Sequence, residues 1–305
     1  MGGFLINNIK MTKLYPLLLI YFLSLQVNSQ DINREVTENT KTPYLLGKIN
    51  KSGLEGENYS SWFSLNYNDY NPNPKLIAEL TKPIKEFSIK LFMGTWCGDS
   101  KILVPKLYKI LEYCQFPMEQ LTVIALSREP KLYKQSPEHE EEGLNVHRVP
   151  TLIFYKNSKE VNRIVEYPIE SLEDDILNIV TVNDYEPNYK VVSAVHNILS
   201  QKGILELKRK QNKLVKLYKE DIQNIYELNT YGRVLYSTGH IDEAIEVFEL
   251  NTKFYPNEAR PYMSLANTLG ILGEKEKAIA TLKTAIEVLP ENKDLKENLI
   301  TIENY

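Results

Sequence analysis

The stretch FMGTWCGDSK, residues 92 to 101, decides the fold expected for the first half of the chain. An apolar, strand-like run leads into Trp96 and Cys97, and a helix-like segment follows. A cysteine at the first turn of a helix meets the positive end of the helix dipole and unpaired backbone N–H groups, which favour the thiolate. Cys97 is therefore the expected nucleophile. Ser100, one helical turn on, is expected to donate a hydrogen bond to the thiolate, and Lys101 adds a positive charge nearby.

The chain has two cysteines, Cys97 and Cys114. If the residues between them form one helix, their Cα atoms lie about 25 Å apart. A disulfide requires Cα atoms within about 7 Å, so the two thiols are not expected to pair. Cys114 is interpreted as a small buried hydrophobic residue.

Composition limits the classes of function. The chain has 305 residues, 43% of them hydrophobic, and a formal net charge of −4, which indicates a globular protein large enough for two domains. The mild acidic balance without basic blocks gives no case for nucleic-acid binding. Four histidines are scattered along the sequence without a spaced Cys/His set, so no metal and no cofactor is expected.

The N-terminus is typical of an export signal. Lys10 and Lys13 precede the apolar run LYPLLLIYFLSL, and small residues surround a cut after Ser29, so residues 1–29 are predicted to be a signal peptide. A membrane anchor is the alternative, but the run is shorter than the roughly 20 residues that span a bilayer. Met11 is an alternative start. We expect an exported protein, periplasmic or secreted, with no membrane association after cleavage, working where thiols meet disulfides.

Strands and helices are expected to alternate after a flexible segment, residues 30–56. The predicted order is a helix in 74–86, a strand at 87–93, a helix at 97–114, strands at 121–126, 151–155 and 162–167, and a helix at 170–180. This order predicts an α/β domain with helices on the faces of a central sheet. The charged segment 127–143 is interpreted as a solvated connection rather than a binding site.

Residues 57–183 resemble the thioredoxin-fold family. Besides the Trp-Cys pair, Pro105 falls where thioredoxins kink the active-site helix, and RVPTLIFYKN (148–157) resembles the segment that carries the family's cis-proline and next strand. The stretch is further similar to a subgroup of exported bacterial thioredoxin-like proteins with the Trp-Cys-Gly-Asp-Ser form. The resemblance implies that Pro150 is cis and that Val149 holds a substrate strand beside the sulfur.

The resemblance assigns functions to the residues around the nucleophile. Cys97, Ser100 and Pro150 are the expected catalytic residues, and Trp96, Gly98, Asp99 and Val149 are expected to contact substrate. Asp99 is interpreted as a helix cap or first-turn charge, with proton transfer as the alternative.

Two departures from the family limit the chemistry. Ser100 replaces the second cysteine that would attack the mixed disulfide, and Leu91 stands where thioredoxins place a buried acid. The sequence therefore predicts a monothiol thiol-disulfide oxidoreductase or isomerase, whose mixed disulfide an external thiol resolves during isomerisation, deglutathionylation or client trapping. Its partners would be protein thiols or disulfides, or a low-molecular-weight thiol. The alternative is a redox-inactive scaffold.

The last third of the sequence repeats with a period of 34 residues. The series Gly232, Gly239, Ala244, Phe248 and Pro256 recurs as Ala266, Gly273, Ala278, Leu282 and Pro290. This resembles the tetratricopeptide repeat, an all-α helical module. Repeats are expected at 225–258 and 259–292, with a capping helix in 293–305 and a helical linker or degenerate repeat at 184–224.

The repeat resemblance implies a groove for a protein or peptide, lined by the first helix of each repeat. Seven residues are expected there: Tyr226, Asn229, Arg233, Tyr236, Arg260, Met263 and Asn267. Tyrosine, arginine and asparagine suit an interface. The alternative is that the repeats only cap the first domain or support a homodimer.

Overall fold

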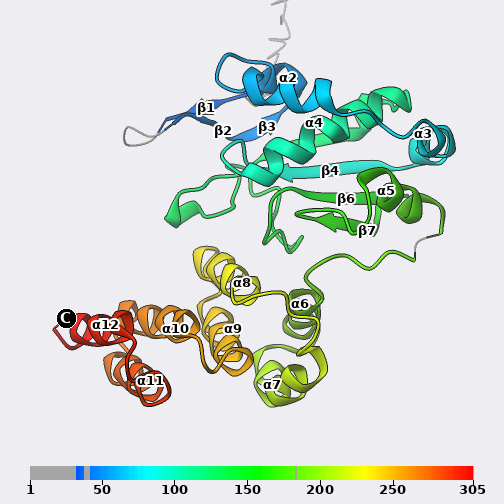
Figure 1. Cartoon of the computed structure of the whole chain (residues 1–305). Coiled ribbons are helices and arrows are strands. Elements are labelled where there is room, and N and C mark those ends of the chain that lie inside the picture. Colours follow the sequence, from blue (N-terminus) through cyan, green and yellow to red (C-terminus); the bar gives the residue numbers. More distant parts are fainter. Residues whose placement is uncertain (1–31, 38–41, 183, 305) are drawn as a thin grey trace, which may run out of the picture. The chain divides into compact units, whose positions relative to one another are not determined.

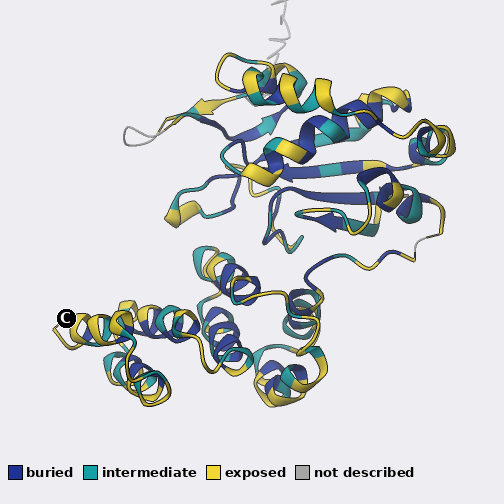
Figure 2. Ribbon diagram, viewed as in Figure 1, coloured by how far each residue is buried: buried dark blue, intermediate teal, exposed yellow. Residues whose placement is uncertain are grey.

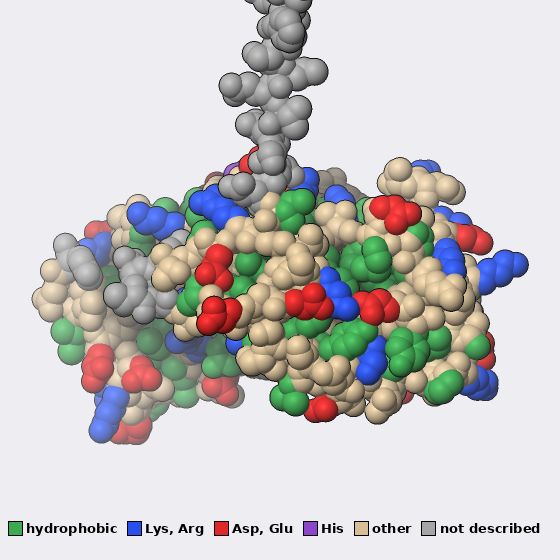
Figure 3. Space-filling view, turned by 90° about the horizontal axis from the view of Figure 1, so that it is seen from above, with side chains coloured by type: hydrophobic (Ala, Val, Ile, Leu, Met, Phe, Trp, Pro, Cys, Tyr) green, Lys and Arg blue, Asp and Glu red, His purple; other side chains and the backbone are tan. Residues whose placement is uncertain are grey.

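The computed structural model describes residues 32–37, 42–182 and 184–304. The expected signal peptide, residues 1–29, lies outside the described residues. Among the described helices, none is long and apolar enough to cross a membrane. On the face drawn in Figure 3, charges of both signs are interspersed with hydrophobic side chains.

A mixed sheet of five strands organises the first half of the chain. The strands are β3 (Gly47–Ile49), β4 (Ser88–Met93), β5 (Leu121–Ala125), β6 (Thr151–Lys156) and β7 (Lys159–Val165). Their order is β3-β5-β4-β6-β7, with β4 and β5 parallel and the other pairs antiparallel. The central strand β4 leads into Cys97, so the nucleophile expected from sequence is held at one end of the sheet.

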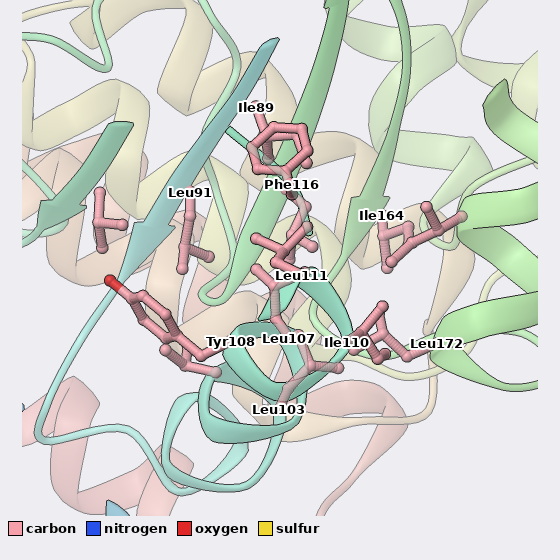
Figure 4. Packing of buried hydrophobic residues seen from close by; sticks show 14 of the residues in the cluster. Ile89, Leu91, Leu103, Leu107, Tyr108, Ile110, Leu111, Phe116, Ile164 and Leu172 are labelled. Carbon is pink, nitrogen blue, oxygen red and sulfur yellow. The ribbon is translucent and has the colours of Figure 1, made fainter. Parts of the chain in front are cut away.

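Helices cover one face of this sheet. They are α1 (Lys51–Leu54), α2 (Ser60–Asp69), α3 (Pro74–Leu80), α4 (Gly98–Tyr113) and α5 (Leu172–Thr181), with a 3₁₀ turn at Pro83–Glu86. Figure 1 shows α2 and α4 on the same side of the sheet. In Figure 4, Leu103 and Leu107 of α4 lie near Leu91 of β4, and all three belong to the main core. Burial of this face fixes the start of α4 against β4.

The opposite face is covered mainly by the connection between β5 and β6. Side chains alternate along a strand, so Phe92 and Ile124 point away from the helices. They form a second, smaller cluster with Val146 and Val149 of that connection, against which Trp96 and Cys97 pack. In Figure 2, β4 and β6 are mostly buried, whereas β7 at the edge of the sheet is mostly intermediate or exposed. The expectation of helices on both faces is therefore met on one face only.

The structure differs from the expectation of a flexible segment at residues 30–56. Strand β3 pairs with β5 at the edge of the sheet, and β1 (Glu35–Val36) pairs with β2 (Tyr44–Leu45). Tyr44 is 0% and Leu45 2% exposed. This burial explains why the short apolar run is ordered, so the domain includes residues before the predicted boundary at 57.

A stack of helices forms the second half of the chain (Figure 1). The helices are α6 (Lys190–Lys202), α7 (Ile204–Tyr218), α8 (Tyr226–Ser237), α9 (Ile241–Phe254), α10 (Ala259–Ile271), α11 (Lys275–Val288) and α12 (Lys293–Glu303). Gly239 and Gly273 adopt φ of 84° and 80° between the paired helices, a left-handed conformation that glycine adopts without steric cost. The helix pairs α8–α9 and α10–α11 have the predicted bounds to within a few residues.

The two helix pairs fill corresponding positions with side chains of different size. A Cβ atom at Gly232 of α8 would lie 2.5 Å from the Phe248 ring of α9, so only glycine fits there. Thirty-four residues later the same positions carry Ala266 and Leu282, both 0% exposed. A small residue thus faces a large one in the first pair, and two intermediate residues meet in the second.

We expect Gly232→Ala to destabilise the protein by about 1 kcal/mol, because overpacking outweighs the gain in helix propensity. Phe248→Leu alone should cost about 1 to 2 kcal/mol through a cavity. The double variant reproduces the Ala266–Leu282 pair and should be more stable than the sum of the single changes by about 1 kcal/mol or more. Urea unfolding of the four chains measures this coupling, and strictly additive effects would contradict it.

Candidate functional site

Cys97 is the N-cap residue of α4, directly before its first turn. Its carbonyl accepts the first helical hydrogen bond from Lys101 N–H at 3.1 Å. The thiol is half-buried and donates a hydrogen bond to the Val149 carbonyl at 3.2 Å, while Asp99 Oδ2 lies 3.8 Å from Sγ. The sulfur therefore lies at a helix N-terminus, with a backbone carbonyl and a carboxylate as polar neighbours.

The residues on both sides of the sulfur position it. Trp96 Nε1–H donates to the Leu126 carbonyl at 2.8 Å, and its ring packs where a Cβ on Gly94 would clash at 2.6 Å. The Val149–Pro150 peptide bond is cis. Gly98 is exposed, and a Cβ there would meet nothing within 4 Å, so the space beside Cys97 is open to a partner.

The Ser100 hydroxyl has a different hydrogen-bond partner from the expected Cys97 thiolate. Its side chain is 0% exposed, and its hydroxyl accepts a hydrogen bond from Gly94 N–H at 3.2 Å. It holds the loop before α4 instead of bonding to the Cys97 sulfur. Leu91, where a buried acid was looked for, is 0% exposed and part of the main core.

Three charged residues near Cys97 were not predicted from the sequence. Arg148 forms an ion pair with Glu166 at 3.2 Å, and each side chain is 14% exposed. Burial raises the pKa of Glu166, although Arg148 and Lys134 act in the opposite direction. Burial, with the nearby Arg148 charge, lowers the pKa of Lys134 to about 7, although Cys97 and Glu166 partly oppose this. A cation that titrates near neutral pH thus lies within electrostatic reach of the sulfur.

The charged segment 127–143 packs against helix α8 and is not simply a solvated connection. Gln135 Nε2 donates to the Ser237 carbonyl at 3.0 Å, and Ser237 Oγ donates to the Tyr133 carbonyl at 3.3 Å. The Arg233 guanidinium lies 4.2 Å from the centre of the Tyr133 ring. Lys134 and Gln135 are 5% and 6% exposed. The interpretation of this segment from charge alone was wrong for these residues.

Arg148 also connects the sheet domain to the helices. Its Nη2 donates to the Tyr226 carbonyl at the start of α8 at 3.0 Å, and its guanidinium lies 4.9 Å from the Tyr189 ring centre. The Tyr189 hydroxyl hydrogen-bonds to Glu166. Because Arg148 directly precedes Val149, the loop facing Cys97 is tied to the helical region.

His147 belongs to the loop that leads to the cis-proline, and its side chain is buried. It is 2% exposed, with its ring edge-to-face against Tyr189 and Tyr231. Burial lowers its pKa well below the usual range. The other three histidines, His139, His196 and His240, line one cavity of about 470 Å³ between α6, α8 and the β5–β6 connection. In the described part of the chain, no group of three or more His, Cys, Asp or Glu residues could hold a metal ion.

The structure separates the seven expected groove residues into two sets. On α8, Tyr226 and Arg233 take part in the contacts with the sheet domain, Asn229 is 5% exposed and Tyr236 is half-buried. On α10, Arg260 and Asn267 are exposed and Met263 packs partly against the helical core. A second cavity of about 650 Å³ lies instead over α7, α9, α10 and α11, and its lining includes Lys208, Glu249 and Tyr262.

Comparison with protein families identifies one of the two repeats. The model for the tetratricopeptide repeat matches residues 259–292, which contain α10 and α11. The comparison with curated proteins finds no match. The helical region thus contains a tetratricopeptide repeat, a module that generally binds proteins or peptides. This supports a protein-interaction role for that part of the chain.

Proposed function

We propose that the sheet domain is thioredoxin-like and performs monothiol thiol-disulfide chemistry through Cys97, and that the repeats bind or position its protein partner. The observation that carries this is the contact between the Cys97 thiol, at the N-terminus of α4, and the Val149 carbonyl next to a cis-proline. A thiol held against the backbone of the loop before β6 suits the capture of an extended partner chain. The strand order and the open space at Gly98 are consistent with this function.

In the proposed reaction, the Cys97 sulfur attacks one sulfur of a partner disulfide. A Cys97–partner S–S bond forms, the partner's own S–S bond breaks, and the released thiolate takes up a proton. The Asp99 carboxylate, 3.8 Å from Sγ, is placed to accept the proton that Cys97 loses. For isomerisation, another thiol of the partner then attacks the partner sulfur of the mixed disulfide, which frees Cys97 and leaves the partner re-paired. For reduction, two external thiols resolve the mixed disulfide in turn: the partner leaves as a thiol, Cys97 is freed, and the two external thiols end joined by a disulfide.

Two residues explain why a thiol from outside the Cys97 site must resolve the mixed disulfide. Ser100 cannot attack a disulfide, and Leu91 offers no proton acceptor in the core. The same two substitutions would lengthen the life of the mixed disulfide, which suits an isomerase or a client trap. The N-terminal apolar run supports export to an oxidising compartment, where such disulfides persist.

The alternative is a redox-inactive scaffold that acts through its repeats. The match of residues 259–292 to the tetratricopeptide repeat favours it, because that match stands without any role for Cys97. In this alternative, partner binding depends on α10 residues such as Arg260 and Asn267 and not on the thiol.

Alkylation separates the two functions. With iodoacetamide and the folded protein at pH 7, we expect Cys97 in a Cys114→Ser chain to react at least about 10-fold faster than Cys114 in a Cys97→Ser chain, because Cys114 is 0% exposed. In urea the two rates should converge. A Cys97 that reacts only after unfolding would leave the scaffold as the function of this chain.

A further inference from the structure

We propose that the Cys97 site selects polypeptide partners that carry acidic residues beside their reactive sulfur, and that Arg233 and Lys134 supply this selectivity. The inference rests on the proposed function and names its class of partner. It also makes helix α8 part of the reactive site, since Arg233 belongs to the helical region.

Arg233 is an exposed cation held near the sulfur without an acidic partner. Its guanidinium stacks on the Tyr133 ring, and it forms no hydrogen bond or ion pair with the residues that the structure describes. Burial raises the pKa of Tyr133, and the charges of Arg233, Arg148 and Cys97 all act on its hydroxyl. Tyr133 therefore contacts the guanidinium of Arg233 and lies within electrostatic reach of the Cys97 thiol.

Lys134 is a second cation without an acceptor. It is 5% exposed, and within the described ranges its ammonium group makes no hydrogen bond or ion pair, its closest aromatic contact being the Tyr133 ring at 5.4 Å. A buried ammonium without a partner is costly unless an anion arrives or the group loses its proton. A carboxylate of a bound partner would pair with the Lys134 ammonium group. This unpaired group therefore favours a ligand with negative charge.

The opposing charges do not cancel these two cations. Glu166 is already paired with Arg148 and bonded to Tyr189. Asp99 is next to the sulfur on the exposed first turn of α4, and Glu141, Glu142 and Glu243 line the cavity that Lys134 also lines. Among the described residues, none of these acids forms an ion pair with Arg233 or Lys134. A polypeptide fits better than a small compound, because Arg233 and Gly98 are exposed and tetratricopeptide repeats generally bind proteins or peptides.

Charged thiol reagents test the selectivity. In a Cys114→Ser background, the reagents are neutral methyl, anionic sulfonatoethyl and cationic trimethylammonioethyl methanethiosulfonate. In each reaction the Cys97 sulfur forms a disulfide with the reagent sulfur, the reagent's S–S bond breaks and methanesulfinate leaves. Relative to free cysteine, we expect the anionic reagent to react about five-fold faster than the cationic one, and Arg233→Gln to remove most of this preference. Arg209→Gln, an exposed arginine of α7, is the matched control and should leave it unchanged.

The outcomes distinguish the two proposals. No reaction of the folded chain with the neutral reagent overturns the proposed function. A normal neutral rate without charge preference, or a preference that survives Arg233→Gln, overturns only this inference. In a second arm, peptides with a thionitrobenzoate-activated cysteine flanked by Glu or by Lys are compared, the Cys97 sulfur bonding to the peptide sulfur as thionitrobenzoate leaves. The Glu peptide should react faster, and equal peptide rates alongside a preference for the sulfonate would overturn the polypeptide assignment.

Discussion

Ser100→Cys is expected to convert Cys97 from a trap into a self-resolving site. A thiol one helical turn away attacks the mixed disulfide intramolecularly, so the lifetime of that disulfide should fall by about 100-fold or more. Ser100 is buried in the first turn of α4, three residues after Cys97, so a thiol there would lie one helical turn from the Cys97 sulfur. The decay of a purified mixed disulfide, followed by intact mass without added thiol, measures the effect.

Ser100→Ala is the control for this change. It removes the hydrogen bond that Gly94 N–H donates to the hydroxyl, at a cost of about 1 kcal/mol, but adds no sulfur. Its mixed disulfide should last as long as that of the unchanged chain. If the Ser100→Cys adduct is equally long-lived, Cys97 does not form a disulfide that a neighbour at this position can attack.

Arg148→Ala is expected to destabilise the protein by about 2 to 3 kcal/mol. The change leaves the Glu166 carboxylate and the Tyr226 carbonyl without their guanidinium partner, and both of these groups join the sheet domain to the helical region. Urea unfolding at pH 7 gives the loss. The Arg209→Ala variant, which removes a 70% exposed partner of Glu206 in α7, should have nearly unchanged stability.

The pH dependence gives this prediction a second readout. Burial raises the pKa of Glu166 and Arg148 lowers it, so removing Arg148 raises it further. A carboxyl whose folded pKa lies above its unfolded value costs stability when ionised, and this cost disappears as pH falls toward the unfolded value. The loss caused by Arg148→Ala should therefore be smaller at pH 5 than at pH 8. A loss below 1 kcal/mol at both would mean that Arg148 does not hold the two parts together.

The local pattern around Cys97 was sufficient to predict its placement. The strand run and the helix start predicted that Cys97 would lie at a helix N-terminus, and the family resemblance predicted the cis-proline at 150, as observed. The 34-residue period likewise predicted the turns at Gly239 and Gly273. Their φ values near 80° favour glycine, so the residue type itself marks the turn. Such features follow from a few neighbouring residues.

Contacts between distant segments could not be predicted. The segment 127–143 is polar in sequence, and only its packing on α8 buries Lys134 and Gln135. His147 is buried by Tyr189 and Tyr231, which come from α6 and α8 and are far away in sequence. The strands at 44–49 were missed because they are two and three residues long and have too few positions to show a period.

The groove prediction shows the same limit. The 34-residue period correctly predicted where the first helices of the repeats lie, but it carries no information on which of them faces the sheet domain. Tyr226 and Arg233 of α8 take part in contacts with the sheet domain while their side chains stay exposed, and Arg260 and Asn267 of α10 are exposed as well. A partner in the groove would therefore meet exposed side chains of both helices.

The central claim is tested most directly by mixing the folded Cys114→Ser chain with a model protein that has been reduced and reoxidised so that it contains disulfides. Intact mass spectrometry then shows whether the two proteins become linked. The expected result is a single adduct, mapped to Cys97, that persists until an external thiol is added and is absent from the Cys97→Ser chain. A folded chain that forms no adduct, while the same chain in urea does, would contradict the claim that Cys97 performs thiol-disulfide chemistry.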